Sequence, residues 1–177
     1  AQRDYNHPSV VLYSTGNEVA ETAQKRGIKL CGDMTEFLHS VDDRPVTCGI
    51  NVFFNLLSSI GFGIYTDDKA EKSAREKKPK KKKAVGSEFF NNLAGLFGAT
   101  TMKIGATMPG VNAKTKDAFA NLDVAGYNYG ILRYKGDMRR YPDRVLLGSE
   151  TFFADARRFY VMATKPTASI GDFFCAG

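Results

Sequence analysis

Two glutamates in this sequence stand among polar residues, and each directly follows a short apolar segment. Glu18 ends the run Thr15-Gly16-Asn17-Glu18, and Glu150 lies within Ser149-Glu150-Thr151. Of two carboxyl groups, one can act as a general acid and the other as a nucleophile. The hydrolysis of a glycosidic bond requires such a pair, and neither role needs a metal or a cofactor. The alternative is that each glutamate only begins a following helix, where the helix dipole favours a negative charge.

The segments around these glutamates predict a parallel α/β fold. Five short, nearly continuous apolar runs are typical of strands that are buried on both faces. They cover residues 10–14, 45–49, 123–127, 144–148 and 170–174. Helical periodicity predicts helices between them over residues 28–41, 87–97, 114–121 and 152–163. Alternating strands and helices are the pattern of a parallel sheet.

Three of the predicted strands end in polar residues. In parallel α/β folds the ligand lies beyond the carboxyl ends of the strands, where the following loops converge. Asn128-Tyr129 follows the third strand, as the two glutamate runs follow the first and fourth. We therefore expect the three polar runs to form one site.

Three sequence motifs resemble one known family. R-D-Y-N-H-P-S-V-V-L-Y-S-T-G-N-E, over residues 3–18, resembles the acid/base signature of glycoside hydrolase family 2, in which an Asn-Glu pair ends the fourth strand of a TIM barrel. G-Y-N-Y (126–129) and P-D-R-V-L-L-G-S-E-T (142–151) are similar to the sixth strand and the nucleophile strand of that family. Their order and spacing agree along nearly the whole chain, and within the family the likeness is closest to bacterial β-galactosidases.

The resemblance implies different roles for the two glutamates. Glu18 would be the general acid/base and Glu150 the nucleophile of a retaining double displacement. These roles need different environments: Glu18 with a raised pKa, so that it holds a proton, and Glu150 ionised by nearby donors. No cofactor and no metal are implied.

The resemblance also implies substrate-binding residues beside the two glutamates. Asn17 would hydrogen-bond the 2-hydroxyl of the sugar, a contact that strengthens in the oxocarbenium-like transition state. Tyr129, or alternatively Tyr127, would reach the carboxylate of the nucleophile. The substrate-binding set is Asn17, Asn128 and Tyr129.

The fold class implied is a partial TIM (β/α)8 barrel, comprising strands four to eight, with residues 1–177 as one partial catalytic domain. A complete barrel has eight strands in about 250 residues, whereas this chain offers five strands in 177 residues. We expect its partners to be the first three strands and the preceding N-terminal domains of the same enzyme, and we expect little or no activity from this chain alone. Open sheet edges also favour pairing with another copy.

The positive charge of the chain is confined to one segment. Residues 69–83 hold nine basic and two acidic residues, against a net charge of +6 for the whole chain. A segment of this kind fits a nucleic-acid patch, but the favoured interpretation is a solvated insertion over residues 66–86, after the fifth barrel strand, with no nucleic-acid partner.

Composition excludes several other classes of protein. With 43% apolar and 25% charged residues the chain can form a core, and no apolar run approaches the ~20 residues that span a bilayer. We expect a soluble, cytoplasmic protein without a membrane partner. The three cysteines form no C-x-x-C pair, which favours free thiols.

The function that these patterns predict is retaining hydrolysis of terminal β-galactosides, with a carbohydrate as substrate. The alternatives are another family 2 activity, β-glucuronidase or β-mannosidase, or a noncatalytic carbohydrate-binding or scaffold module. The last keeps support from the eighth strand, where Cys175 stands in place of the aromatic residue, usually Trp, that the resemblance leads one to expect.

Overall fold

The structure, a computed structural model, describes residues 2–60, 98–155 and 170–172, which form one five-stranded parallel sheet. Its strand order, β1-β2-β3-β4-β5, follows the sequence, and every neighbouring pair is parallel. The strands are β1 (Tyr13–Asn17), β2 (Val46–Asn51), β3 (Val124–Asn128), β4 (Val145–Glu150) and β5 (Ile170–Asp172). Sequential parallel strands are the arrangement found in a (β/α)8 barrel, and the predicted parallel α/β fold is confirmed.

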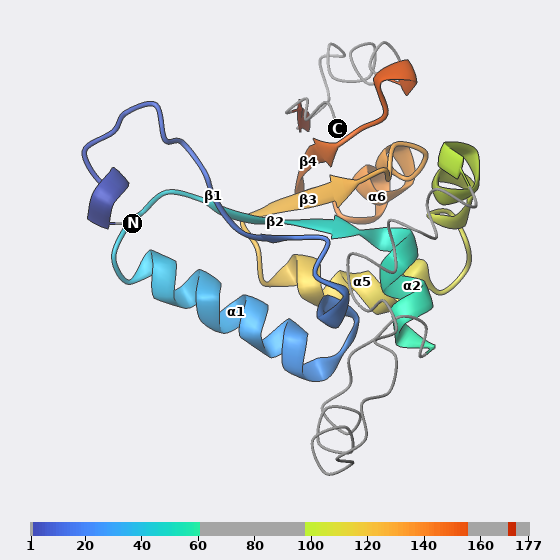
Figure 1. The fold of residues 1–177 in the computed structure, drawn as a ribbon, viewed down its shortest axis with the longest axis horizontal. Helices are drawn as coiled ribbons and strands as arrows, with labels where there is room; N and C mark the ends of the chain where they lie inside the picture. Colours follow the sequence, from blue (N-terminus) through green and yellow to red (C-terminus); the bar gives the residue numbers. More distant parts are fainter. Residues whose placement is uncertain (1, 61–97, 156–169, 173–177) are drawn as a thin grey trace, which may run out of the picture.

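Helical segments connect successive strands (Figure 1). The α-helices are α1 (Lys25–His39), α2 (Val52–Ser59), α5 (Val111–Ala120) and α6 (Tyr134–Arg140), with residues 98–105 also helical. The 3-10 helices are η1 (Gln2–Asp4), η2 (Ala20–Ala23) and η3 (Phe153–Asp155). Of the predicted helix over 152–163, residues beyond 155 lie outside the described part of the chain, as does the predicted helix over 87–97.

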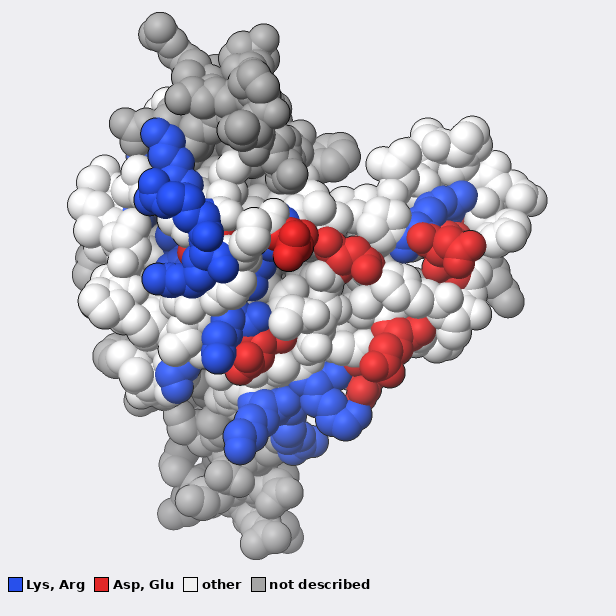
Figure 2. Space-filling view, turned by 180° about the vertical axis from the view of Figure 1, so that it is seen from behind, with Lys and Arg blue, Asp and Glu red and all other residues white. Residues whose placement is uncertain are grey.

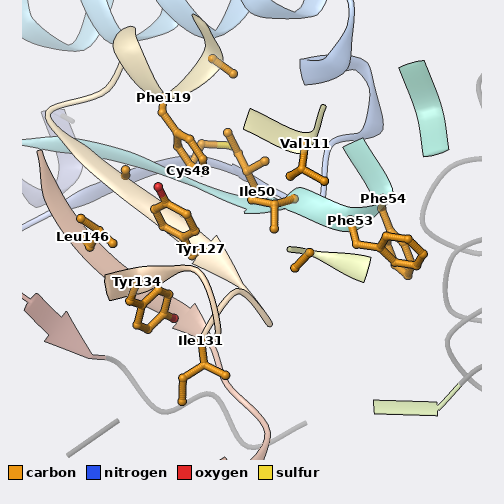
Figure 3. Packing of buried hydrophobic residues seen from close by; sticks show 14 of the residues in the cluster. Cys48, Ile50, Phe53, Phe54, Val111, Phe119, Tyr127, Ile131, Tyr134 and Leu146 are labelled. Atoms are coloured by element: carbon orange, nitrogen blue, oxygen red, sulfur yellow. The ribbon is translucent and has the colours of Figure 1, made fainter. Parts of the chain in front are cut away.

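The main core fills the space between the helices and one face of the sheet (Figure 3). At its centre, the fully buried ring of Tyr127 on β3 stacks on Phe119 of α5, with ring centroids 4.4 Å apart. Tyr134 of α6 meets the same ring edge-on, at 5.6 Å. Such aromatic pairs add about 0.5–1.5 kcal/mol each beyond the area they bury, so they fix the position of β3.

Helix α1 is less buried than its periodicity suggests. Cys31 packs into the core, but much of the apolar stripe predicted for residues 28–41 is exposed. The exposed members are Leu30, Met34, Phe37 and Val41. Apolar side chains three or four positions apart lie on one helix face, so α1 carries an apolar strip that the described residues leave uncovered.

The strands are displaced from their predicted bounds towards the polar residues. β1 begins at Tyr13 rather than residue 10, because the ladder with β2 starts at the pair Tyr13 and Val46. The amide of Tyr13 donates a hydrogen bond to the carbonyl of Pro45 at 3.0 Å. β2 runs two residues further than predicted, to Asn51, β3 runs one further, and β4 runs two further. Polar residues expected in loops therefore belong to the sheet.

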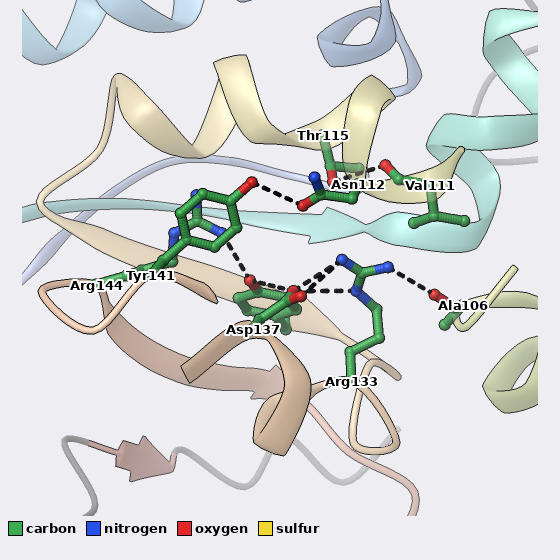
Figure 4. A network of polar contacts seen from close by, with 9 residues as sticks. Ala106, Val111, Asn112, Thr115, Arg133, Asp137, Tyr141 and Arg144 are labelled. Carbon is green, nitrogen blue, oxygen red and sulfur yellow. Dashed lines mark hydrogen bonds and ion pairs between the residues drawn. The ribbon is translucent and has the colours of Figure 1, made fainter. Parts of the chain in front are cut away.

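A buried ion pair joins helix α6 to the sheet (Figure 4). The guanidinium of Arg133 contacts both carboxylate oxygens of Asp137 at 2.8–3.1 Å and donates to the carbonyl of Ala106 at 3.0 Å. Tyr127 donates its hydroxyl to the same carboxylate at 2.9 Å and accepts from Arg144 at 3.0 Å. This network ties α6 to the strand that ends in Asn128.

Charges on the described surface are mixed. Figure 2 shows lysine and arginine side chains beside aspartate and glutamate side chains on the back of the molecule. The basic segment 69–83 and the insertion predicted over 66–86 lie outside the described residues, so their interpretation stays a prediction. Within the part of the chain that is described, no helix combines the length and apolar character needed to cross a membrane.

Candidate active site

The carboxyl ends of β1 to β4 bring the predicted site residues to one edge of the sheet. In the strand register Asn17 is paired with Gly49, Asn51 with Asn128, and Asn128 with Glu150. Asn51, Asn128 and Glu150 thus lie side by side on β2, β3 and β4, and Asn17 on β1 lies beside Gly49, two residues before Asn51. The three polar runs that the sequence predicts to form one site therefore lie at this edge of the sheet, and Asn51 of β2 lies there with them.

Glu150, the last residue of β4, is held by two of the other predicted site residues. Asn17 donates its Nδ2 hydrogen to Oε1 at 2.5 Å, and the hydroxyl of Tyr129 donates to Oε2 at 2.5 Å. The carboxylate therefore accepts one short hydrogen bond on each oxygen, from two other strands. The predicted alternative to Tyr129 does not reach it, because Tyr127 points its hydroxyl to Asp137 in the core.

Asn128 and Ser149 fix the orientation of the Asn17 amide. Ser149 donates to Oδ1 of Asn128 at 2.6 Å, and Nδ2 of Asn128 donates to Oδ1 of Asn17 at 2.8 Å. With its oxygen engaged, Asn17 can only turn its nitrogen to Glu150. Asn128 is fully buried and contacts Asn17 and Ser149, so its predicted contact with substrate stays a prediction.

Gly49 gives the Asn17 side chain the space that it occupies. A Cβ atom at position 49 would overlap with Oδ1 of Asn17 and would lie 3.0 Å from Oδ1 of Asn128. Because both contacts are with the hydrogen-bonded amides, neither amide could move away without losing a partner. The absence of a side chain at position 49 is therefore a condition of the site.

Glu18 follows β1 and is attached to β2. Its backbone has φ = 51°, in the left-handed region, and its amide donates to the carbonyl of Gly49 at 2.8 Å. Its Oε1 accepts a hydrogen bond from Nδ2 of Asn51 at 2.9 Å. Burial raises the pKa of Glu18, the bond from Asn51 lowers it, and the charge of Glu150 raises it again. The net rise matches the environment expected for a general acid.

Neither glutamate serves as the start of a helix. Glu150 is the last residue of β4, and η3 begins three residues later at Phe153. Glu18 lies before η2, whose N-cap is Val19. The helix-dipole alternative therefore loses its structural basis.

Tyr129 has the same unusual backbone as Glu18. Its φ is 56°, and its amide donates to the carbonyl of Glu150 at 2.8 Å. The ring stacks on Phe152, with centroids 4.4 Å apart. Left-handed backbone at residues other than glycine is concentrated at functional sites, where surrounding contacts hold it in place. Among the described residues, Glu18 and Tyr129 are the two non-glycine residues with this backbone, and both interact with Glu150.

We expect Glu18→Gln to stabilise the fold at neutral pH. A raised pKa means that ionising Glu18 costs more in the folded than in the unfolded state. The variant should therefore match the wild type in acid, and its advantage should grow as the pH rises from 4.5, the ordinary pKa of the group. It should level off above the raised pKa. Unfolding midpoints of both proteins across this pH range measure the effect; Glu36→Gln, at an exposed glutamate, should show no such trend.

Other ligand chemistry is sparse in the described residues. Among them, no group of three or more His, Cys, Asp or Glu side chains is arranged to hold a metal ion. Cys31 and Cys48 are buried free thiols, as expected. Cys175 lies outside the described residues, so its place in the site stays untested.

Sequence reasoning missed two residues of the site, Gly49 and Asn51, and it placed Ser149 in the site without a role. Asn51 had a usable signal, because it is an asparagine at the end of a strand, as are Asn17 and Asn128. The predicted strand stopped at residue 49, so this match went unused. Gly49 acts by leaving space for the Asn17 side chain, and Ser149 acts through the direction of its hydroxyl group; neither role has a sequence signature.

Comparisons with known proteins agree with this fold. The family model for the TIM barrel domain of glycosyl hydrolases family 2 matches residues 1–102. Comparison with curated proteins gives no match. Among solved structures, a glycosyl hydrolase family 2 member from Bacteroides cellulosilyticus DSM 14838 is similar, with a TM-score of 0.60 and 26% identity, over 97% of this chain and 16% of its own.

A second crystal structure of a family 2 member from Bacteroides cellulosilyticus has a similar fold, with a TM-score of 0.59 and 24% identity. The match covers 97% of this chain and 15% of the chain of that relative. The present chain thus spans about one sixth of the length of these relatives. Since the family model matches more than half of the 177 residues, the chain belongs to glycosyl hydrolase family 2, as part of its TIM barrel domain.

Proposed function

We propose that this chain carries both catalytic carboxyl groups of a retaining β-glycosidase that acts on terminal β-galactosides. The observation that carries the proposal is the contrast between two glutamates at one sheet edge. Glu150 accepts a hydrogen bond on each carboxylate oxygen, and Glu18 has a raised pKa in a partly buried setting. Retaining glycosidases divide their work between two such groups.

In the first step, Glu18 in its acid form gives its proton to the oxygen of the leaving group. A carboxylate oxygen of Glu150 attacks the anomeric carbon, and the bond to the leaving oxygen breaks with its electron pair. In the second step, Glu18 takes a proton from water, whose oxygen attacks the same carbon and releases Glu150. Tyr129 and Asn17 hold the carboxylate of Glu150 in place through their hydrogen bonds, while it loses its charge on forming the glycosyl ester and regains it when the ester is hydrolysed.

The proposal concerns a longer polypeptide. The chain covers 16% of its structural relative, and five strands close only part of an eight-stranded barrel. We expect the remaining strands and preceding domains to complete the walls of the sugar pocket. The isolated chain is then expected to have little or no activity. Specificity for galactosides rests on the motif resemblance, and glucuronides and mannosides are the competing substrates.

Covalent trapping tests the proposal. The full-length polypeptide would be incubated with a 2-deoxy-2-fluoro-β-galactoside that has a dinitrophenyl leaving group, and its peptides analysed by mass spectrometry. The expected result is one fluorosugar ester on Glu150, formed faster than with the glucuronide or mannoside analogues. A label on another residue, or turnover without any label, would overturn the nucleophile assignment. Binding without turnover or label would favour a noncatalytic carbohydrate-binding module, and absence of both binding and turnover would favour a scaffold.

A further inference from the structure

Asn51 is a buried asparagine at the end of β2 that contacts Glu18, and no role has been assigned to it so far. It is 3% exposed. Its side chain bridges two structures: Oδ1 accepts from the amide of Phe54, at 3.1 Å, and Nδ2 donates to Oε1 of Glu18, at 2.9 Å. One amide group thus joins the start of a helix to a carboxyl group of the site.

The helix decides which way this amide faces. Asn51 is the N-cap of α2, and its oxygen satisfies one of the amide groups that a helix start leaves unpaired. Helix α2 is itself fixed, because the side chains of Phe53 and Phe54 are buried in the core. With the oxygen committed to the helix, only the nitrogen can face Glu18.

Both the backbone and the side chain of Glu18 are held by β2. The carbonyl of Gly49 accepts a hydrogen bond from the amide of Glu18, and Asn51 donates a hydrogen bond to the carboxyl group of Glu18. The other groups that face this carboxyl are Glu150, whose charge raises its pKa, and Asn128, which lowers it. Of the neighbouring side chains, Asn51 has the largest influence on the pKa of Glu18.

We propose that Asn51 is a positioning residue for proton transfer: it holds Glu18 through Oε1 and leaves Oε2 to carry the proton. This rests on the proposed function. In a carboxylic acid, the unprotonated oxygen is the better acceptor of a hydrogen bond. A donor fixed on Oε1 therefore favours the proton on Oε2, from which it passes to the leaving oxygen as the glycosidic bond breaks. In the second step, Oε2 takes a proton back from water.

Asparagine suits this position because it offers an acceptor and a donor on one rigid group. Asn51→Asp separates the two functions. Aspartate can still cap α2, since a carboxylate at a helix N-terminus is favourable. It cannot donate to Glu18, and it adds a negative charge beside it. Asn51→Ser is the second variant: it keeps a capping oxygen, adds no charge, and is too short to replace the amide.

The test compares two substrates in the full-length polypeptide. A phenyl β-glycoside needs a proton on its leaving oxygen, whereas a dinitrophenyl β-glycoside leaves without one. General acid catalysis contributes about 10²- to 10⁴-fold. Both variants should lose about 10²-fold in kcat/KM on the phenyl substrate and only a few-fold on the dinitrophenyl substrate. Equal losses on both substrates, or no loss, would overturn the proposal.

The pH profile gives a second readout. Both the lost donor and the added charge of Asn51→Asp raise the pKa of Glu18, so the alkaline limb of kcat/KM should move to higher pH. Asn51→Ser should move it in the same direction by less. An unchanged limb in both variants would contradict a contact between Asn51 and Glu18 in the working enzyme.

Two controls separate this inference from its alternatives. Asn55→Asp makes the same chemical change at a buried position one turn later on α2, and it should leave the ratio of the two substrate rates unchanged. In the Glu18→Gln background, Asn51→Asp should have no further effect on that ratio. If the wild type neither hydrolyses nor is labelled, the proposed function fails. If it does both and the variants show no selective loss, only the role of Asn51 fails.

Discussion

Glu150→Gln is expected to lower kcat/KM of the full-length enzyme by roughly 10⁴-fold or more, as removal of a nucleophile does in other enzymes. An amide oxygen carries no negative charge and is a much weaker nucleophile than a carboxylate oxygen. The substitution also upsets the local hydrogen bonds. The carboxylate now accepts from both Asn17 and Tyr129, whereas a glutamine has one acceptor atom, so one of the two donors must turn away.

The loss should appear on phenyl and dinitrophenyl substrates alike, because with either substrate Glu150 attacks the anomeric carbon in the same step in which the leaving group departs. This distinguishes Glu150 from Glu18, whose loss is felt mainly with the poorer leaving group. Glu36→Gln makes the same chemical change at an exposed glutamate of α1 and should leave the rate unchanged. Hydrolysis within tenfold of the wild type by Glu150→Gln would remove this residue from the mechanism.

Asp137→Ala is expected to destabilise the fold by about 3–5 kcal/mol, because it leaves the charge of a buried arginine unpaired. The side chains of Arg133 and Asp137 are only 7% and 5% exposed. Asp137 also accepts the hydroxyl of Tyr127, so the substitution leaves two donors without this carboxylate. Denaturant unfolding of the full-length polypeptide, followed through the transition of the barrel domain, measures the loss.

A matched ion pair on α1 provides the control. Lys29 and Asp33 have the same spacing of four residues and a distance of 2.6 Å, but their side chains are 75% and 53% exposed. Exposed helical pairs of this kind contribute about 0.3–0.5 kcal/mol. Asp33→Ala should therefore have a small effect. If the two substitutions cost the same, the pair between Arg133 and Asp137 is exposed to water in the folded protein.

Much of the fold could be predicted from the sequence. Every predicted strand exists, because nearly continuous apolar runs identify parallel strands that are covered on both faces. Strand bounds were less predictable. Val10 and Val11 favour a strand by propensity, but they precede the point at which β1 meets β2, and Val11 is 60% exposed. Pairing partners decide where a strand begins, and a single strand does not specify its partner.

The two glutamates of the site were predictable from the sequence, but the residues that position them were less so. Polar residues after apolar runs pointed to Glu18, Glu150, Asn17 and Tyr129, which the structure brings to one sheet edge. The role of Asn51 depends on which way an amide is turned, and a helix cap decides that. The sequence does not distinguish the buried pair of Arg133 and Asp137 from the exposed pair of Lys29 and Asp33, which has the same spacing, because burial is a property of the packed fold.

The left-handed backbones at Glu18 and Tyr129 have a consequence for the dynamics of the site. Residues that follow a strand often belong to loops that open independently of the sheet. Here each amide is bonded to a carbonyl of the neighbouring strand, Gly49 or Glu150. Both residues can therefore swing out only if they break away from that strand. We infer that the site moves with the sheet as one cooperative unit.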